Sequence, residues 1–216
     1  MGDTIDIHQL VGWLRRFHDL VQDQTAYLTE LDSAIGDADH GTNMARGMES
    51  VVGKLDSGSA STVDELFKTV GMTLVTTVGG ASGPLYGTLF LRFGAAAGAV
   101  DRLDGPGLAA ALRAGLDGVV ARGKAEAGDK TMFDALSPAV DALDAALAGG
   151  AAPADAVAVA RDAAIAGRDA TGPLVAKKGR ASYLGERSVG HIDPGSASTA
   201  LLISALADEL AAPSEA

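Results

Sequence analysis

The chain contains no cysteine, which excludes disulfides and thiolate metal sites. Aromatic residues make up only 4% of its 216 residues, and long alternating runs of valine, isoleucine and tyrosine are missing. Because such runs are typical of strands, we expect no β-sheet. No apolar stretch is long enough to span a bilayer, and the N-terminus lacks the basic and apolar regions of a signal peptide. We therefore expect a cytoplasmic protein without a membrane partner.

Basic residues are also scarce. The chain has 17 lysines and arginines against 28 aspartates and glutamates, which gives a formal net charge of −11. A field of this sign repels nucleic acid and anionic membranes. The charge therefore disfavours nucleic acid as a partner. A bound nucleotide would need a metal ion and local dipoles to overcome the same repulsion.

Apolar residues at helical spacing are present in almost every segment. Their recurrence at i, i+3 and i+4 predicts about eight amphipathic helices in one all-α domain over residues 1–216. Three connections between these helices are Gly-rich, polar and partly charged, and we expect them at one end of the domain. They cover residues 78–87, 123–132 and 177–195.

The densest cluster of polar residues lies between two of the helical patterns. Its carboxylates, Asp32, Asp37 and Asp39, would repel one another unless a cation lies between them, and all-oxygen ligands suit magnesium or calcium. The last two lie on one side of the connection if it is extended. A solvated turn is the simpler interpretation. An EF-hand is excluded, because Thr42 and Met48 stand where that loop needs glycine and glutamate.

The helix expected to begin near Thr42 would present unpaired backbone N–H groups to an anion. A metal site beside such a helix N-terminus is suited to the phosphates of a nucleotide. His40 neighbours the carboxylates, and both neutral hydrogen bonding and metal ligation are open for it.

Two further loops have a functional and a purely structural interpretation. Residues 79–83 can cradle phosphate with their backbone N–H groups, or simply end one helix before Pro84 starts the next. Arg180 is flanked by small residues that would let its guanidinium reach a phosphate or stack on a base. The sequence Asp193–Gly195 is typical of a turn.

Together these loops resemble the L subunits of bacterial dihydroxyacetone kinases. The matching stretches follow in order over nearly the whole chain, at 34–43, 79–87, 122–132 and 178–195. The resemblance implies an all-α barrel of eight antiparallel helices with a nucleotide, ADP or ATP, at one end.

The resemblance also implies a role for individual residues. It assigns two Mg2+ ions to Asp32, Asp37 and Asp39. The residues assigned to the nucleotide are His40, Gly41, Thr42 and Asn43 at the phosphates, Ala81 and Ser82 at phosphate oxygens, Gly123 and Met132 at the base or ribose, and Arg180 with Asp193, Pro194 and Gly195 closing over it.

The activity that the resemblance implies is phosphoryl transfer to dihydroxyacetone, which a separate K subunit holds, so that this chain is inactive alone. In one branch of the family, ADP stays bound and a phosphohistidine on an M subunit of the phosphotransferase system recharges it. In the other branch ATP exchanges freely, and a free-standing chain of this length favours the first. Alternatives are an ATP-dependent subunit for another small hydroxyketone, a relative acting on a fatty-acid carrier protein, and a non-catalytic nucleotide-sensing module.

Overall fold

The computed structural model describes residues 4–58 and 60–212. Within these residues the chain forms nine α-helices, one 3₁₀ helix and one two-stranded sheet, so the predicted all-α class is confirmed. The strands are β1 (Thr4–Asp6) and β2 (Arg102–Asp104). The helices are α1 (Ile7–Asp23), α2 (Thr25–Ile35), α3 (His40–Ser57), α4 (Val63–Thr77), α5 (Ser82–Ala97), α6 (Gly105–Gly123), α7 (Phe133–Ala148), α8 (Pro153–Ala170), η1 (Arg180–Ser188) and α9 (Pro194–Ala211).

The small sheet corrects the expectation that the chain has no strands. β1 and β2 pair antiparallel, with Ile5 opposite Leu103, and both of these side chains are buried. A strand of three residues is too short for the alternating pattern on which strand prediction depends. The sheet joins the beginning of α1 to the beginning of α6.

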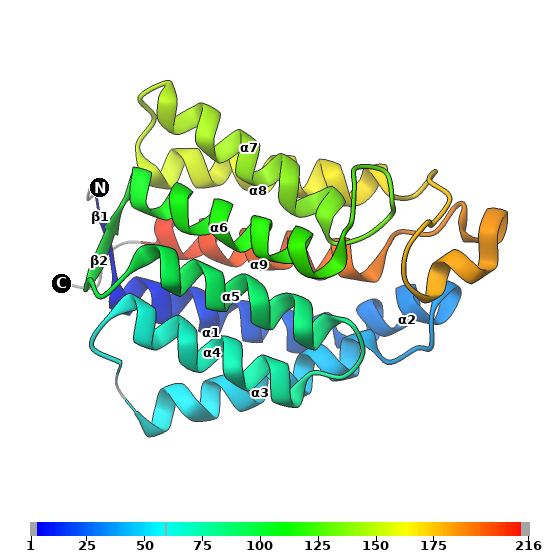
Figure 1. The fold of residues 1–216 in the computed structure, drawn as a ribbon, viewed down its shortest axis with the longest axis horizontal. Coiled ribbons are helices and arrows are strands. Elements are labelled where there is room, and N and C mark those ends of the chain that lie inside the picture. The colour runs from blue at the N-terminus through cyan, green and yellow to red at the C-terminus, as the bar shows by residue number, and fades with distance from the viewer. Residues whose placement is uncertain (1–3, 59, 213–216) are drawn as a thin grey trace.

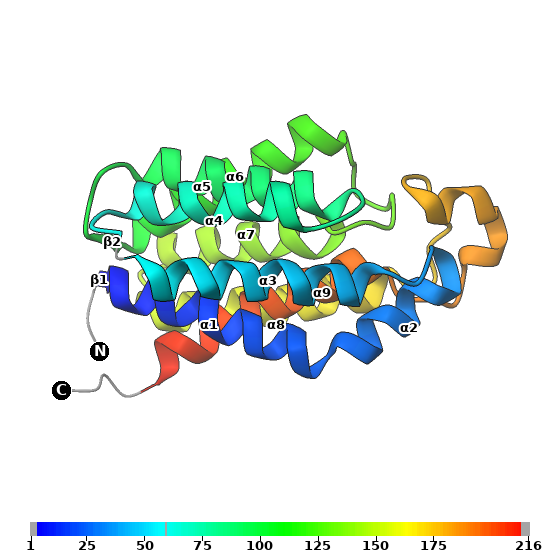
Figure 2. The ribbon, with the colours of Figure 1, turned by 90° about the horizontal axis from the view of Figure 1, so that it is seen from below.

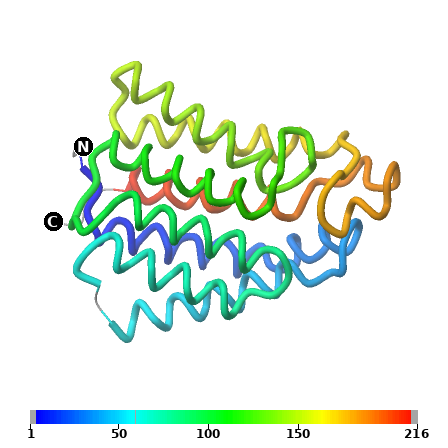
Figure 3. The backbone as a smooth tube through the Cα atoms, viewed as in Figure 1, coloured from blue at the N-terminus to red at the C-terminus, as the bar shows by residue number. Residues whose placement is uncertain are grey.

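Eight of the α-helices described by the structure form a closed ring. The order of contacts runs from α1 to α3, α4, α5, α6, α7, α8 and α9, and α9 contacts α1 again. Neighbours in the ring run in opposite directions (Figures 1 and 2). This order of contacts is the one expected of an antiparallel barrel. The tube in Figure 3 shows that α2 and η1 lie together at one end of the ring, opposite the sheet.

Aspartates mark where several helices begin. Asp6 accepts a hydrogen bond from the backbone nitrogen of Gln9 at 3.0 Å, and the Gln9 side chain accepts one from the Asp6 nitrogen, which completes a capping box on α1. The side chains of Asp104 and Asp193 also cap helices, by accepting the backbone N–H of Gly107 in α6 and of Ser196 in α9, and each is followed by a proline within the first two helical positions. These caps fix where α1 and α6 begin, at the end of the ring that carries the sheet, and where α9 begins, at the opposite end.

The few aromatic residues are concentrated in the middle of the ring. The Trp13 ring lies 5.7–6.0 Å from the rings of Phe67, Phe90 and Phe93, and all four side chains are completely buried. The Trp13 Nε1 donates to the Leu202 carbonyl oxygen at 2.9 Å. One side chain therefore ties α1 to α4, α5 and α9.

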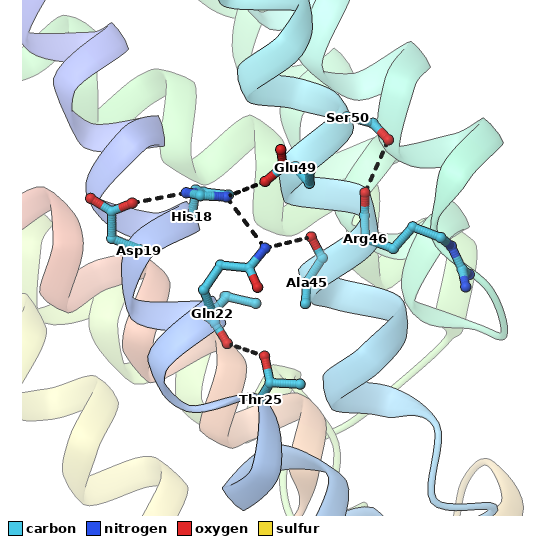
Figure 4. A network of polar contacts seen from close by, with 9 residues as sticks. His18, Asp19, Gln22, Thr25, Ala45, Arg46, Glu49 and Ser50 are labelled. Atoms are coloured by element: carbon cyan, nitrogen blue, oxygen red, sulfur yellow. Dashed lines mark hydrogen bonds and ion pairs between the residues drawn. The ribbon is translucent and has the colours of Figure 1, made fainter.

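A polar network on the outer surface joins α1 to α3 (Figure 4). The His18 ring lies between two carboxylates, with Nδ1 at 2.8 Å from Asp19 and Nε2 at 2.9 Å from Glu49. Gln22 donates to the Ala45 carbonyl oxygen at 3.3 Å. His18 therefore has a structural role, because its ring links α1 to α3.

The helix starts differ slightly from the predicted ones. α3 begins at His40 rather than near Thr42, and α5 begins at Ser82 rather than at Pro84. Both differences extend a helix toward the functional loops. Among the residues that the structure describes, no helix combines the length and apolar character that a membrane crossing requires.

Candidate functional site

A cavity of about 360 Å³ lies at the end of the ring that carries α2 and η1. Its walls come from the end of α2, the starts of α3, α5 and α9, the α6–α7 connection and η1. The predicted site residues that line it are Asp32, Asp37, Asp39, His40, Asn43, Ala81, Ser82, Gly123, Met132, Arg180, Asp193, Pro194 and Gly195. Segments that are far apart in the sequence thus meet at one place. All three Gly-rich connections contribute to the cavity, as expected from the prediction that they lie at one end of the domain.

The carboxylates of Asp32, Asp37 and Asp39, which we call the acidic triad, converge at the cavity. One oxygen of each lies within 4.8 Å of the others. Asp32 is buried at the end of α2, and its Oδ2 accepts hydrogen bonds from the backbone nitrogens of Asp39 (2.8 Å) and His40 (3.1 Å). Negative charges this close repel one another, and the all-oxygen donor set fits a magnesium ion.

The triad converges for a different reason from the one predicted. Between Asp37 and Asp39 the backbone is not extended, because Ala38 has a φ of 62°. This left-handed conformation is uncommon for a residue with a Cβ, and such residues cluster at binding sites. A sharp turn, rather than alternation along an extended segment, brings both carboxylates together with Asp32.

His40 is held between two serine hydroxyls. Its Nε2 lies 2.9 Å from Ser198 Oγ, and its Nδ1 lies 3.1 Å from Ser82 Oγ. Burial lowers the pKa of the imidazole despite the nearby charges of Asp32 and Asp39, so the neutral ring predominates at pH 7. Of the two interpretations open for His40, the structure displays neutral hydrogen bonding.

Tyr86 and Thr199 extend this network below the cavity. The Tyr86 hydroxyl lies 2.7 Å from Ser198 Oγ and 3.1 Å from Thr199 Oγ1, and burial raises the pKa of Tyr86 to about 12. Sequence reasoning missed these residues. The available signal was the run of hydroxyl side chains at the start of an otherwise apolar helix, which only a tertiary contact could connect with His40.

Apolar residues line another part of the cavity. Leu85, Val119 and Ala125 join the predicted Gly123 and Met132 there. Met132 is 4% exposed and belongs to the main core. The cavity therefore has an apolar side, suited to a flat ring, and an anionic side at the triad.

Two predicted residues do not reach the cavity with their side chains. Gly41 packs against α2, where a Cβ would overlap the Thr25 carbonyl oxygen, so glycine permits the close approach of α2 and α3. Thr42 is exposed, and its hydroxyl donates to the Asp39 carbonyl oxygen at 2.9 Å. Neither residue is among those that line the cavity, so the structure does not bring Gly41 and Thr42 together with the other predicted site residues there.

Residues 79–83 fulfil their structural interpretation, and most of them also line the cavity. They separate α4 from α5, and Gly80 has a φ of 64°, which a glycine adopts without strain. Four of them, Gly79, Gly80, Ala81 and Ser82, also line the cavity at the N-terminus of α5. The same turn that connects two helices thus places backbone N–H groups beside the triad.

A segment that we call the lid, residues 176–188, covers the cavity beside the triad and contains η1. The Arg180 guanidinium lies 3.1 Å from the Asp37 carboxylate. Ala176, Ala181 and Leu184 pack on Ile35, the last residue of α2. The exposed ion pair adds little stability by itself, but the apolar contact fixes the lid next to the loop that carries the triad.

Asp193 is buried and begins α9. Its Oδ2 accepts the backbone N–H of Ser196 at 2.6 Å, and its own backbone nitrogen donates to Thr171 Oγ1 at 3.0 Å. Burial raises the pKa of the Asp193 carboxyl to about 7, against the lowering effect of the Ser196 hydrogen bond. The carboxyl therefore gains a proton much more easily in the native protein than in an unfolded chain.

This shift predicts a pH-dependent effect of Asp193→Asn, which keeps a cap for α9. Between about pH 4 and pH 7 the unfolded chain loses this proton first, so the contribution of Asp193 to stability falls as the pH rises. Urea unfolding of both proteins without metal at pH 5 and pH 8 measures it. The free energy of unfolding of the variant minus that of the wild type should be larger at pH 8 than at pH 5. An equal difference at the two pH values would refute the pKa shift of Asp193.

The chain is similar in sequence to known proteins over nearly its whole length. The sequence matches the DAK2 domain over residues 34–208. "PEP-dependent dihydroxyacetone kinase, ADP-binding subunit DhaL" of Escherichia coli is 45% identical over 199 residues, covering 92% of this chain and 95% of that protein. The ADP-binding subunit of the PEP-dependent dihydroxyacetone kinase 1 of Listeria innocua is 44% identical over 203 residues, covering 94% of this chain and 96% of that protein.

A solved structure has the same fold. It is the dihydroxyacetone kinase from C. freundii in complex with AMP-PNP and Mg2+, with a TM-score of 0.70 and 28% sequence identity. The match covers 91% of this chain but 33% of the longer kinase chain. The chain is thus similar over nearly its whole length to the ADP-binding subunits of PEP-dependent dihydroxyacetone kinases. Together with the match over residues 34–208, this similarity shows that the chain belongs to the DAK2 domain family.

Proposed function

We propose that this chain is the nucleotide-binding, phosphoryl-donor subunit of a dihydroxyacetone kinase. The observation that carries the proposal is the convergence of Asp32, Asp37 and Asp39 beside the first turns of α3 and α5 in one cavity. Oxygen ligands suit magnesium, and helix N-termini suit phosphate. The similarity to the two ADP-binding subunits supports ADP as the resident nucleotide and dihydroxyacetone as the acceptor.

The acidic triad would hold two magnesium ions. These ions would neutralise phosphate charge and stabilise the attacking and leaving oxygens of phosphoryl transfer. The first-turn backbone of α3, together with Ala81 and Ser82, would bind phosphate oxygens. Asn43 would donate from its amide nitrogen, because its Oδ1 already accepts from Arg46 at 2.6 Å. In this proposal the backbone N–H groups and polar side chains position the phosphates, and the metal ions with the helix dipoles would offset the repulsion from the net negative charge of the protein.

The apolar side of the cavity would receive the base, with Gly123 and Met132 at its border. Arg180 and residues 193–195, which form the start of α9 rather than the turn expected from the sequence, would close over the nucleotide. Because the lid packs on Ile35 and its Arg180 reaches Asp37, closure of the lid and filling of the metal site would be linked. Such an enclosure favours a nucleotide that stays bound between turnovers.

The acceptor would be held by a separate K subunit, docked at the cavity end of the ring. ADP would be recharged in place by the phosphohistidine of an M subunit of the phosphotransferase system. A reconstitution tests this: dihydroxyacetone phosphate is measured with the chain, a K subunit and a phosphorylated M subunit, each omitted in turn. We expect product only with all three, and ATP should not replace the M subunit. Product from ATP without the M subunit contradicts recharging, and no product from either donor contradicts the kinase role.

Tyr183 offers a test of the docking end. Its side chain is 86% exposed on the lid, and exposed tyrosines frequently anchor protein interfaces. Tyr183→Ser should weaken binding of the chain to the K subunit about tenfold or more, without changing ADP affinity. Val159→Ser, which removes a 49% exposed side chain from α8, is the control. Equal subunit affinity in the two variants would place the interface elsewhere.

A further inference from the structure

The two ends of the lid are joined at a narrow neck, residues 172–176 and 188–190. The Ala176 backbone nitrogen donates to Ser188 Oγ at 2.9 Å, and the Gly190 nitrogen donates to the Gly172 carbonyl oxygen at 2.9 Å. At the start of the lid, the Lys177 nitrogen donates to the Asp129 carbonyl oxygen at 3.1 Å. The neck is therefore held both across itself and to the α6–α7 connection.

Lys130, in the same α6–α7 connection, reaches both backbone segments of this neck. Its ammonium donates to the carbonyl oxygens of Gly172 (3.2 Å) and Leu174 (3.1 Å) on one strand and of Ser188 (2.7 Å) on the other. An ammonium has three donors, and here each has a carbonyl acceptor. One charged group thus ties together backbone segments that are separated by more than a dozen residues.

The environment of Lys130 is unusual for a lysine. The residue is 1% exposed, although lysines are almost never fully buried, and its φ of 64° is rare for a residue with a side chain. Burial lowers the pKa of its ammonium, while the negative charge of Asp193 opposes that effect. Burying a charge is unfavourable unless hydrogen bonds compensate for it. Packing alone therefore does not account for a lysine at this position.

We infer that Lys130 is a positioning residue that pins the neck of the lid and so keeps the lid closed over the nucleotide cavity. With the neck fixed, the lid holds Arg180 beside Asp37 and rests on Ile35. Without the pin, the carbonyls of Leu174 and Ser188 lose the ammonium as a donor, the Gly172 carbonyl keeps only the Gly190 N–H, and the two segments of the neck are held together by fewer hydrogen bonds. The part of this inference that concerns nucleotide release depends on the proposed function, whereas the part that concerns lid closure does not.

The chain offers a matched control for Lys130→Met. Lys124 is also a lysine in the α6–α7 connection and also has a left-handed backbone, with a φ of 52°, but it is exposed. Lys124→Met therefore repeats the change of charge and side chain without touching the neck. Methionine is unbranched like lysine and one atom shorter, so it fills the space of the aliphatic part of the side chain at position 130 and removes the ammonium.

The experiment measures hydrogen exchange of amides 176–190 in nucleotide-free protein and the rate of ADP release from Mg2+·ADP-loaded protein. In Lys130→Met we expect lid exchange and ADP release to be faster by about tenfold or more, while the amides of α1 and α4 stay protected. Lys124→Met should match the wild type. Lid exchange at the wild-type rate in Lys130→Met overturns the inference, and so does a loosened lid that leaves ADP release unchanged.

A second variant covers the case in which Lys130→Met does not fold. Ser188→Ala removes the hydroxyl that links the two neck strands and leaves Lys130 in place. We expect it to loosen the same amides to a smaller extent, and a fully protected lid would count against the pinned neck. If none of the proteins binds ADP, the proposed function fails, yet the exchange data still decide whether Lys130 holds the lid.

Discussion

We expect replacement of both Asp37 and Asp39 by asparagine to abolish magnesium-dependent nucleotide binding and to leave the helical fold intact. Asparagine keeps the size of each side chain but removes two negative charges from a cluster whose oxygens lie within 4.8 Å of one another. We expect ADP affinity in the presence of magnesium to fall by about a hundredfold or more, since ligand charge is what holds a hard cation. Calorimetric titration of nucleotide-free protein with ADP, with magnesium or with EDTA, measures the change.

The same variant separates metal binding from folding. Without metal, its melting temperature should equal or exceed that of the wild type, because like-charge repulsion is relieved. Asp32→Ala should behave differently and lose stability, because it removes Oδ2, which accepts the backbone N–H groups of Asp39 and His40. Asp162→Asn, on the exposed surface of α8, is the control for loss of a charge. Normal ADP binding by the double variant would refute the metal site.

Trp13→Ala should destabilise the protein more than any surface change. The substitution leaves a large cavity among Phe67, Phe90 and Phe93 and deprives the Leu202 carbonyl oxygen of its donor. Truncation of a buried tryptophan typically costs about 3–5 kcal/mol, a large fraction of the stability of a single domain. Urea unfolding followed by circular dichroism measures the free energy of unfolding.

Trp13→Phe distinguishes packing from the hydrogen bond. It retains an aromatic ring in the cluster but loses the Nε1 donor to α9, so we expect a smaller loss, about 1–3 kcal/mol. Such a graded series would show that Trp13 holds α1 against α4, α5 and α9. A Trp13→Ala protein as stable as the wild type would contradict the arrangement of the ring around this side chain.

Much of the fold follows from local features of the sequence. The i, i+3, i+4 recurrence of apolar residues predicts the helices, and Asp104 and Asp193, each followed by a proline, mark two helix starts in the structure. The short sheet escapes prediction because Ile5 is buried by pairing opposite Leu103, almost a hundred residues away. No local pattern carries that contact.

The candidate site divides along the same line. Asp37, Asp39 and Arg180 are found because polar and charged residues are dense in Gly-rich connections. The left-handed turn at Ala38 is not found, because alanine gives no signal for a positive φ. Lys130 and Tyr86 are missed because their partners, Ser188 and Ser198, come from distant segments. Local chemistry thus indicates which loops matter, and tertiary contacts decide which residues hold them in place.

Identification of the nucleotide carried by the purified chain decides whether the cavity at the acidic triad binds ADP with magnesium. The protein is purified alone in the presence of magnesium, dialysed and denatured, and the released nucleotide is quantified by chromatography. We expect stoichiometric ADP, bound under the lid through magnesium ions at the acidic triad. A chain that releases no nucleotide and binds neither added ADP nor added ATP with magnesium would contradict this expectation.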